Sequence, residues 1–311
     1  MSAADALEAL LARALIAGVR AVPWRASLGI GARLGDAAGA LGIRRRVGAE
    51  NLARAFPERS AAERARILRE HYRELGRVAA EYPRLAELAR APAGEVVAEV
   101  RGGEHLERAL AGGRGAILLS GHFGNFELLG ARLARMNPVD FVVRAMANPG
   151  VEALLARQRA AAGVGLIPVE SGARRAFQAL RANRWVALLV DQDAGRDGVF
   201  VPFLGRPAST VAGPARLALA TRAPIVAGFV HRVPDGRHVL EIDPPPELED
   251  ARAPGAVERL TACLTARLER RVRERPEHWL WLHRRWKTAP DRASGGAPES
   301  AGSAAAPAAR G

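Results

Sequence analysis

The sequence contains little cysteine, little lysine and few aromatic residues. Its 311 residues include one cysteine, Cys263, which excludes an internal disulfide bond and a multi-cysteine metal site. Cys263 lies in a stretch with helical periodicity, so we expect a buried thiol. Aromatic residues make up 5% of the chain and are not interleaved with basic ones, which argues against a nucleic-acid module.

All but one of the 46 basic residues are arginine, and the formal net charge is +13. Such a preference for arginine is typical of the amino-acid composition of a whole genome, but it has a physical consequence. Because arginine binds phosphate and carboxylate groups through two parallel hydrogen bonds, we expect an anionic membrane surface, a phosphorylated lipid or an acidic carrier protein as partner. A nucleic-acid binder would explain the charge alone, with a steeply salt-dependent affinity for DNA as its signature. No nucleic-acid partner is predicted.

The N-terminal region lacks both a basic start and a long uninterrupted apolar run. Asp5 and Glu8 stand where a secretory signal has basic residues, and Arg13 and Arg20 interrupt the apolar positions. The apolar residues of 1–45 follow helical spacing, which predicts amphipathic helices. Two interpretations stay open: helices packed on the domain, or helices lying in a membrane interface. The arginine triplet that ends this region either adds an electrostatic contact or forms a solvated turn.

The rest of the chain is predicted to form one domain over 46–288, followed by a tail. Residues 5–90 have helical patterns, and Ser60-Ala-Ala-Glu63 is a capping box that begins a helix running to about Glu81. The tail at 289–311 is rich in alanine, glycine, proline and serine, which predicts disorder.

From Ala116 onward, short apolar runs alternate with helical patterns. The runs predict strands at 116–120, 141–143, 164–169, 185–190, 224–230 and 239–242. The patterns between and after them predict helices at 149–162, 173–183, 213–221 and 256–273. This alternation indicates an α/β fold with a mostly parallel central sheet flanked by helices, preceded by an N-terminal helical segment.

The most informative motif is Gly121-His-Phe-Gly-Asn-Phe-Glu127, between the first predicted strand and a helical stretch. A turn after a strand is where α/β enzymes usually hold catalytic groups. His238 and Asp243 have the same spacing, but they lie in a strand-like segment, which puts their side chains on opposite faces. The context therefore selects His122.

The histidine turn predicts proton transfer. An imidazole takes a proton from an alcohol near neutral pH, so we assign His122 as general base and Glu127 as the carboxylate that orients it. The following helix N-terminus is expected to keep His122 neutral. Backbone amides around Gly124 and Asn125 are expected to bind an oxyanion.

Two further groups of polar residues follow predicted strands. Asp191-Gln192-Asp193 has three interpretations: a metal site, capping of a turn and helix, or lining of the same crevice as His122. No metal is predicted, because further ligands are missing nearby, and lining of the crevice is favoured. Arg144 ends another strand and is expected to hold a phosphate or the carbonyl side of a donor, whereas Arg159 lies farther along the next helix.

The C-terminal segment at 279–288 is rich in tryptophan and basic residues. Trp279 and Trp281 are expected to be core or interfacial anchors. His283, Arg284, Arg285 and Lys287 either contact lipid phosphates or form a solvated basic segment.

The chain resembles the bacterial lipid A biosynthesis acyltransferases, within the lysophospholipid acyltransferase superfamily. The matching motifs are Asn51-Leu-Ala-Arg-Ala-Phe-Pro57, Gly121–Glu127, Arg144 with Asn148-Pro149, Asp191-Gln-Asp193, Val201-Pro-Phe-Leu-Gly-Arg-Pro-Ala-Ser-Thr210 with Gly213-Pro214, and Trp281-Leu-His-Arg-Arg-Trp-Lys-Thr288. They cover about 50–288 in order. Phe126 stands where many members have tryptophan, and the N-terminus is a less clear membrane anchor than is common in the family.

The resemblance implies an enzyme that transfers a fatty acyl chain from a thioester to a hydroxyl of a lipid A-type glycolipid precursor. It places the His-x-x-x-x-Asp/Glu motif on His122 and Glu127, the arginine block on Arg144 or Arg159, and the acidic block on Asp191 or Asp193. No cofactor is implied. The donor is acyl carrier protein or coenzyme A loaded with the chain, and the site is the cytoplasmic face of the inner membrane, with peripheral or weak anchoring. The alternatives are an acyltransferase for another glycolipid or a lysophospholipid, such as phosphatidylinositol mannoside, and a non-catalytic peripheral lipid-binding protein.

Overall fold

The computed structural model describes residues 3–290, so most of the predicted disordered tail lies outside the described residues. Five α-helices come first among the described residues, in agreement with the helical patterns predicted over 5–90. They are α1 (Ala3–Arg20), α2 (Trp24–Ala40), α3 (Arg45–Ala55), α4 (Ala61–Glu81) and α5 (Leu85–Arg90). The capping box begins α4 as expected: the Glu63 N–H donates to Ser60 Oγ at 3.2 Å, and the Ser60 N–H donates to Glu63 Oε2 at 2.7 Å.

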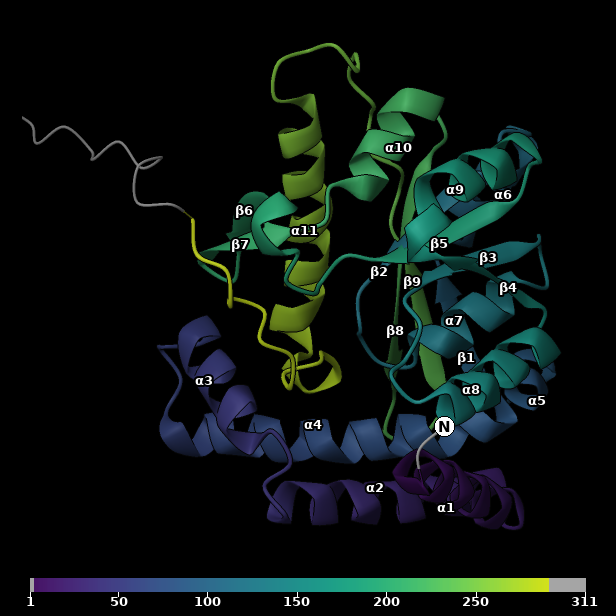
Figure 1. Ribbon diagram of the computed structural model, residues 1–311, viewed down its shortest axis with the longest axis vertical. Coiled ribbons are helices and arrows are strands. Elements are labelled where there is room, and N and C mark those ends of the chain that lie inside the picture. Colours follow the sequence, from purple (N-terminus) through teal and green to yellow (C-terminus); the bar gives the residue numbers. More distant parts are fainter. Residues whose placement is uncertain (1–2, 291–311) are drawn as a thin grey trace, which may run out of the picture.

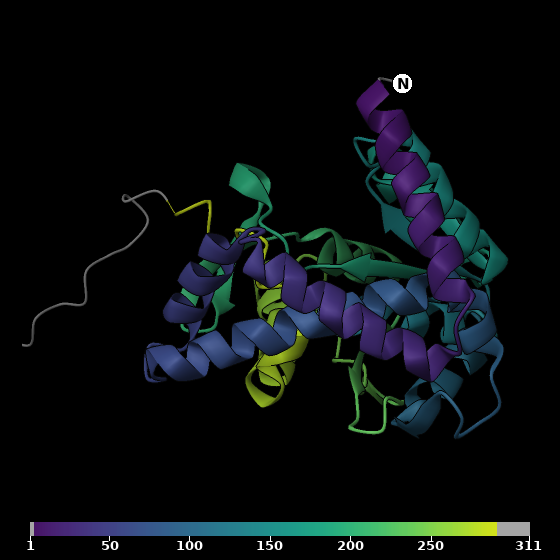
Figure 2. The ribbon, with the colours of Figure 1, turned by 90° about the horizontal axis from the view of Figure 1, so that it is seen from below.

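The helix α2 packs closely along α4, and α1 extends away from this pair (Figure 2). Glycines make the close approach possible. A Cβ on Gly31 would collide with the backbone of Gly76, and one on Gly35 would collide with the backbone of Tyr72. The α2–α4 pair lies across one end of the sheet, and α4 runs along that end (Figure 1).

A seven-stranded sheet forms the centre, in the order β1-β9-β8-β2-β5-β3-β4. The strands are β1 (Val97–Arg101), β2 (Ala116–Ser120), β3 (Val139–Val143), β4 (Val164–Pro168), β5 (Trp185–Leu189), β8 (Ile225–Arg232) and β9 (His238–Ile242). Strands β8, β2, β5, β3 and β4 are parallel, whereas β9 runs antiparallel to β8. The prediction of a mostly parallel sheet is confirmed.

Helices cover both faces of the sheet (Figure 1). The first layer contains α5 with α6 (Gly103–Ala111) and α7 (Phe126–Leu133), which share one apolar core. The second contains α9 (Gly172–Arg181), α10 (Gly213–Thr221) and α11 (Ala256–Glu274), which share another. The helix α8 (Pro149–Ala161) packs on α1, α5 and β4. Because the parallel strands all end at the same edge, polar residues that follow them meet there.

Three strands were not predicted. The edge strand β1 has only its first residue buried, so it lacks an apolar run. No strand was predicted where β6 (Val199–Phe203) and β7 (Arg206–Thr210) form a hairpin. Its two-residue turn, Leu204-Gly205, has positive φ at both positions, as the tight hairpin turns of twisted strands do.

One prediction about the core was wrong. Cys263 lies on α11 as expected, but its side chain is exposed. The buried stripe of this helix contains Leu260, Thr261 and Leu264, and Cys263 falls beside it.

Candidate active site

The loop that carries His122 connects β2 to α7 and is held by the C-terminal segment. The Gly124 N–H donates to the His278 carbonyl at 2.9 Å, and the Leu280 N–H donates to the His122 carbonyl at 3.1 Å. Gly124 has a φ of +55°, and a Cβ at this position would collide with the Val230 carbonyl oxygen. Glycine is therefore required here for two reasons, its backbone conformation and its close packing.

His122 pairs with Asp191, which follows the neighbouring strand β5. His122 Nδ1 lies 2.8 Å from Asp191 Oδ1, and the His122 backbone N–H donates to Asp191 Oδ2 at 2.7 Å. The Trp279 indole N–H donates to the same Oδ2 at 2.9 Å. Because the carboxylate accepts from Nδ1–H, the neutral imidazole keeps its free lone pair on Nε2, which is the nitrogen that can act as a base.

The pKa values of this pair are coupled. Burial lowers the pKa of His122, but the charge and hydrogen bond of Asp191 outweigh burial, and the net pKa is raised above 6.5. Burial raises the pKa of Asp191, yet His122 and Trp279 hold it below 3.8. The sequence analysis expected the helix N-terminus to keep His122 neutral, whereas the raised pKa that Asp191 causes favours the protonated form. Protonated His122 stabilises the fold fully below about pH 6.5, and this contribution is lost as the pH rises through the raised pKa.

Glu127 does not make the predicted contact with His122. It is buried and accepts hydrogen bonds from the Arg159 guanidinium, at 2.6 Å from Nη2 and 3.2 Å from Nε. Asp191 therefore takes the orienting position that was predicted for Glu127. The physical reason is that Glu127 lies in the first turn of α7, where Arg159 of α8 reaches it. Of the two predicted arginines, Arg159 lies at this site, whereas Arg144 is exposed and makes no hydrogen bond to the described residues.

Of the two backbone amides predicted to bind an oxyanion, that of Gly124 makes a structural bond, whereas the contacts of Asn125 described here are those of its side chain. The Gly124 amide is used by the His278 carbonyl, which rules out its predicted role in this arrangement. The Asn125 side chain caps α7 by accepting from the Leu128 N–H at 3.0 Å, and it donates to Glu81 Oε2 at 2.8 Å. Glu81 in turn lies within a buried ion pair with Arg232, at 2.7 Å. Asn125 therefore fixes the start of α7.

The remaining predicted residues make no hydrogen bond to His122 within the described part of the chain. The Asn148 side chain caps α8 and donates to Glu8 Oε2 of α1 at 2.7 Å. The Gln192 side chain is exposed. Asp193 accepts from Thr288 Oγ1 at 2.8 Å, so it ties this loop to the C-terminal segment. Within residues 3–290 no group of three or more histidine, cysteine, aspartate or glutamate side chains could hold a metal ion.

The C-terminal segment contributes more contacts to the site than the sequence analysis predicted. Trp279 was predicted as an anchor, and its bond to Asp191 was missed. Arg285 is not solvated: it lies over the Phe203 ring, donates to Ser209 O and Thr210 Oγ1, and burial lowers its pKa to about 10. The tryptophans at 279 and 281 were the sequence signal for this role of the segment. A large aromatic side chain with an N–H group needs a hydrogen-bond partner when it is buried.

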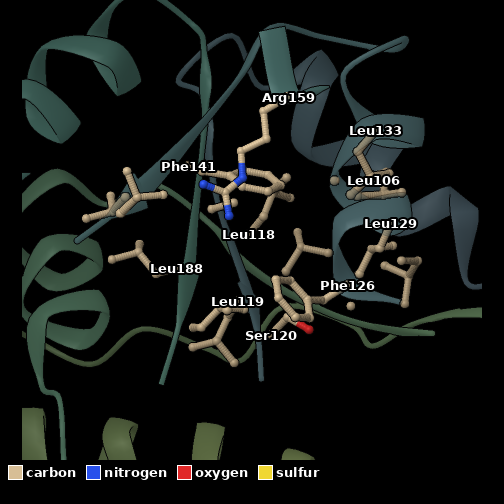
Figure 3. Close-up of a pocket in the computed structure, with 18 residues that line it drawn as sticks. Leu106, Leu118, Leu119, Ser120, Phe126, Leu129, Leu133, Phe141, Arg159 and Leu188 are labelled. Carbon is tan, nitrogen blue, oxygen red and sulfur yellow. The ribbon is translucent and has the colours of Figure 1, made fainter. Parts of the chain in front are cut away.

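An apolar cavity lies beside the histidine loop, between α7 and the sheet (Figure 3). It encloses about 590 Å³ of space between atoms, a figure that includes its open mouth. Leucines from α6, α7, β2 and β5 line it, with Ser120 and Phe126 at the His122 side and Arg159 over the Phe141 ring. The Phe126 ring contacts the His122 ring, with 5.2 Å between centroids. The cavity therefore suits a hydrocarbon chain whose reactive end lies near His122.

Replacing Trp279 by phenylalanine is expected to lower kcat about tenfold, because a hydrogen bond to a charged group contributes about 1.5–3 kcal/mol. The Asp191 pKa should also rise. Ionised Asp191 stabilises the fold above its unfolded pKa of about 3.8, and this contribution is lost as pH falls through the folded pKa. The variant should therefore unfold at a higher pH on acidification, which circular dichroism measures.

The matched control is Trp281→Phe. Trp281 is equally buried, and its N–H donates to the Pro276 carbonyl rather than to Asp191. This variant should keep kcat within about twofold. Equal losses of kcat in the two variants would show that Trp279 acts only through packing.

The mostly parallel α/β fold holds a His–Asp pair at the ends of adjacent strands, next to an apolar cavity, which is an arrangement suited to proton transfer beside an apolar ligand. The comparison with known proteins agrees. A family model described as bacterial lipid A biosynthesis acyltransferase matches residues 5–288, and the chain belongs to this family.

Individual relatives fall into two groups. The chain is 30% identical to the lipid A biosynthesis lauroyltransferase of Escherichia coli K12, over 83% of this chain and 86% of that protein. It is 29% identical to the palmitoleoyltransferase of the same strain, over 86% and 87%. It is 31% identical to the phosphatidylinositol mannoside acyltransferase of Mycobacterium tuberculosis H37Rv, over 60% of this chain. That match spans 59% of the mycobacterial protein's length.

Proposed function

We propose that this protein transfers a fatty acyl chain from an acyl thioester to a hydroxyl of a glycolipid, with His122 as general base and Asp191 as the carboxylate that orients it. The observation that carries this proposal is the 2.8 Å contact between His122 Nδ1 and Asp191 beside the apolar cavity. It leaves Nε2 as the basic nitrogen. The resemblance to E. coli lipid A enzymes over most of the chain favours a lipid A-type precursor as acceptor. The mycobacterial relatives favour phosphatidylinositol mannoside as the second candidate.

The reaction requires no covalent enzyme intermediate. His122 Nε2 takes the proton of the acceptor hydroxyl, and the oxygen attacks the thioester carbonyl carbon. The tetrahedral intermediate then collapses, the C–S bond breaks, and the leaving thiolate takes the proton back from the imidazolium. Asp191 stabilises the imidazolium between the two transfers, because its negative charge is fixed by the backbone and by Trp279.

The apolar cavity is the proposed acyl slot. A hydrocarbon chain placed there removes apolar surface from water, which contributes about 0.8 kcal/mol per buried CH₂ group. Arg159 lines this cavity, and its ion pair with Glu127 links α8 to α7. The thioester carrier, either an acyl carrier protein or coenzyme A, remains outside the cavity in this arrangement.

A membrane surface is the proposed partner of α1. Leu7, Leu10, Leu11 and Leu15 on this helix are each more than half exposed. None of the described helices has the length and apolarity that a membrane-spanning segment needs. A helix with an exposed row of leucines is suited to the interface between headgroups and acyl chains.

Replacing both Leu10 and Leu11 by aspartate is expected to lower binding to phosphatidylglycerol-containing vesicles at least tenfold, measured by co-sedimentation, because two exposed leucines that would enter the lipid interface become charged groups. The control is Phe177→Asp on α9, which replaces an exposed apolar residue on a different helix. Equal binding by the leucine variant and the wild type would contradict the proposal.

The function is tested by incubating the purified protein with a lauroyl thioester and each candidate glycolipid, followed by mass spectrometry of the lipids. The proposal predicts that one glycolipid gains the mass of one lauroyl ester. Hydrolysis of the thioester without a lipid product, or no consumption of it with either glycolipid, would contradict the proposal.

A further inference from the structure

A buried ion pair between Glu81 and Arg232 lies near the histidine loop (121–125) and has no part in the proposed mechanism. Glu81 ends α4, and Arg232 ends β8. The Arg232 Nη1 and Nη2 atoms donate to Glu81 Oε1 and Oε2, both at 2.7 Å, and its Nε donates to Glu74 at 3.0 Å. All three side chains are almost completely buried. Burial raises the pKa of Glu81, but His238 and Arg232 outweigh burial and hold the pKa below 4.5, so Glu81 is ionised.

Glu81 holds the end of the histidine loop through Asn125. The Asn125 Nδ2 donates to Glu81 Oε2 at 2.8 Å, and its Oδ1 accepts from the Leu128 N–H at 3.0 Å. Because an ionised carboxylate only accepts hydrogen bonds, Glu81 fixes the direction in which the amide points. Phe126, the first residue of α7, packs its ring against the ring of His122. This ring contact therefore depends on the place where α7 begins.

Arg232 holds the preceding loop residue, Gly124, through its backbone. The Arg232 N–H donates to His278 Nε2 at 3.1 Å, and the His278 carbonyl accepts from the Gly124 N–H at 2.9 Å. Gly124 also packs so closely on β8 that a Cβ would collide with the Val230 carbonyl oxygen. Two consecutive residues of the loop are thus held by groups that both bind Arg232, one by its side chain and the other by its backbone.

We propose that the Arg232–Glu81 ion pair positions the histidine loop. By fixing the last two loop residues, it keeps His122 at hydrogen-bond distance from Asp191. The inference rests on the proposed role of His122 as general base, and it assigns Arg232 and Glu81 as positioning residues, neither of which lines the apolar cavity. Because desolvation offsets much of the attraction between two buried charges, such a pair adds little net stability compared with apolar residues of the same size. Its directed hydrogen bonds are what distinguish it.

The test is Arg232→Lys, which keeps the positive charge but cannot reproduce the fork that binds Glu81 and Glu74 together. We expect kcat to fall about tenfold or more, because a small misplacement of a catalytic group is costly even when the substituted residue lies outside the site. The contact between His122 and Asp191 should weaken, so the pKa of the His122 ring should fall toward 6.5 in a ¹⁵N NMR titration. An unchanged pKa of His122 would overturn the proposal, whatever the loss of kcat.

The matched control is Arg271→Lys on α11. Arg271 also binds two carboxylates, at 3.1 Å from Glu241 and 2.9 Å from Asp243, and it makes no hydrogen bond to the histidine loop within the described residues. This variant should lower the melting temperature about as much as Arg232→Lys, but kcat and the pKa of His122 should stay at their wild-type values. Equal falls of the His122 pKa in the two variants would reflect a general loss of packing and would also overturn the proposal.

If Arg232→Lys does not fold, Asn125→Ser takes its place. The serine hydroxyl still caps α7, but it is too short to reach Glu81 as well. We expect kcat to fall about tenfold, as for a lost hydrogen bond to a charged group, together with a fall in the pKa of His122, whereas an unchanged pKa would overturn the proposal. Failure of the proposed function is seen separately, since His122→Ala would then keep the wild-type rate, and the ring titration reports the position of the loop without any substrate.

Discussion

Replacing His122 by alanine is expected to lower the rate of acyl transfer about 10²- to 10⁴-fold, the usual contribution of a positioned general base. The thioester and the glycolipid should still bind, because the apolar cavity is formed by other residues. The fold should persist, since the His122 backbone bonds to Asp191 and Leu280 remain possible. The measurement is single-turnover transfer of a radiolabelled lauroyl group, with thermal unfolding as the check on folding.

The matched control is His105→Ala, which removes a histidine of α6 that does not line the apolar cavity. Its rate should equal that of the wild type. A His122→Ala enzyme that keeps more than about a tenth of the wild-type rate would show that another group takes the proton.

Replacing Asp191 by asparagine is expected to produce the second largest effect, a loss of about 10²- to 10⁴-fold in kcat. The asparagine amide can donate to Nδ1, which favours the tautomer with its proton on Nε2 and removes the free base. The negative charge that offsets burial also disappears, so the pKa of His122 should fall and the acid limb of kcat/KM should move to lower pH.

The comparison variant is Glu127→Gln, because Glu127 is the carboxylate that the local sequence favours. It should weaken the bond to Arg159 and reduce activity much less than Asp191→Asn, with little change in the acid limb. If Glu127→Gln shifts the acid limb and Asp191→Asn does not, the roles of the two carboxylates must be exchanged.

The fold was predictable where buried strands have continuous apolar runs. Two central strands were predicted from their apolar runs, Ala116–Ser120 and Trp185–Leu189, because both faces of these strands are covered. The edge strand β1 and the β6–β7 hairpin escaped prediction, because they are stabilised by pairing and by turn geometry rather than by a strong apolar pattern. The exposed Cys263 has a different cause: its burial was expected from the usual behaviour of a free thiol, whereas the buried stripe of α11 passes beside it.

The candidate base was predictable, but its partner was not. His122 follows a strand in a glycine-rich turn, and this local context is visible in the sequence. Asp191 was predicted to line the same crevice, yet its pairing with His122 depends on β2 and β5 being neighbours in the sheet. An isolated β-bridge between Phe123 and Trp279 brings Trp279 next to the His122–Asp191 pair. No local sequence pattern indicates this bridge. The nearest carboxylate in sequence, Glu127, was therefore chosen over the nearest in space.

The most direct test is a pH titration of the His122 ring by ¹⁵N NMR in the wild type, Asp191→Asn and Glu127→Gln. We predict a wild-type pKa above 6.5, a neutral form with its proton on Nδ1, and a lower pKa in Asp191→Asn with only a small change in Glu127→Gln. A wild-type pKa below 6.5, or a pKa that responds to Glu127 and not to Asp191, would contradict the account.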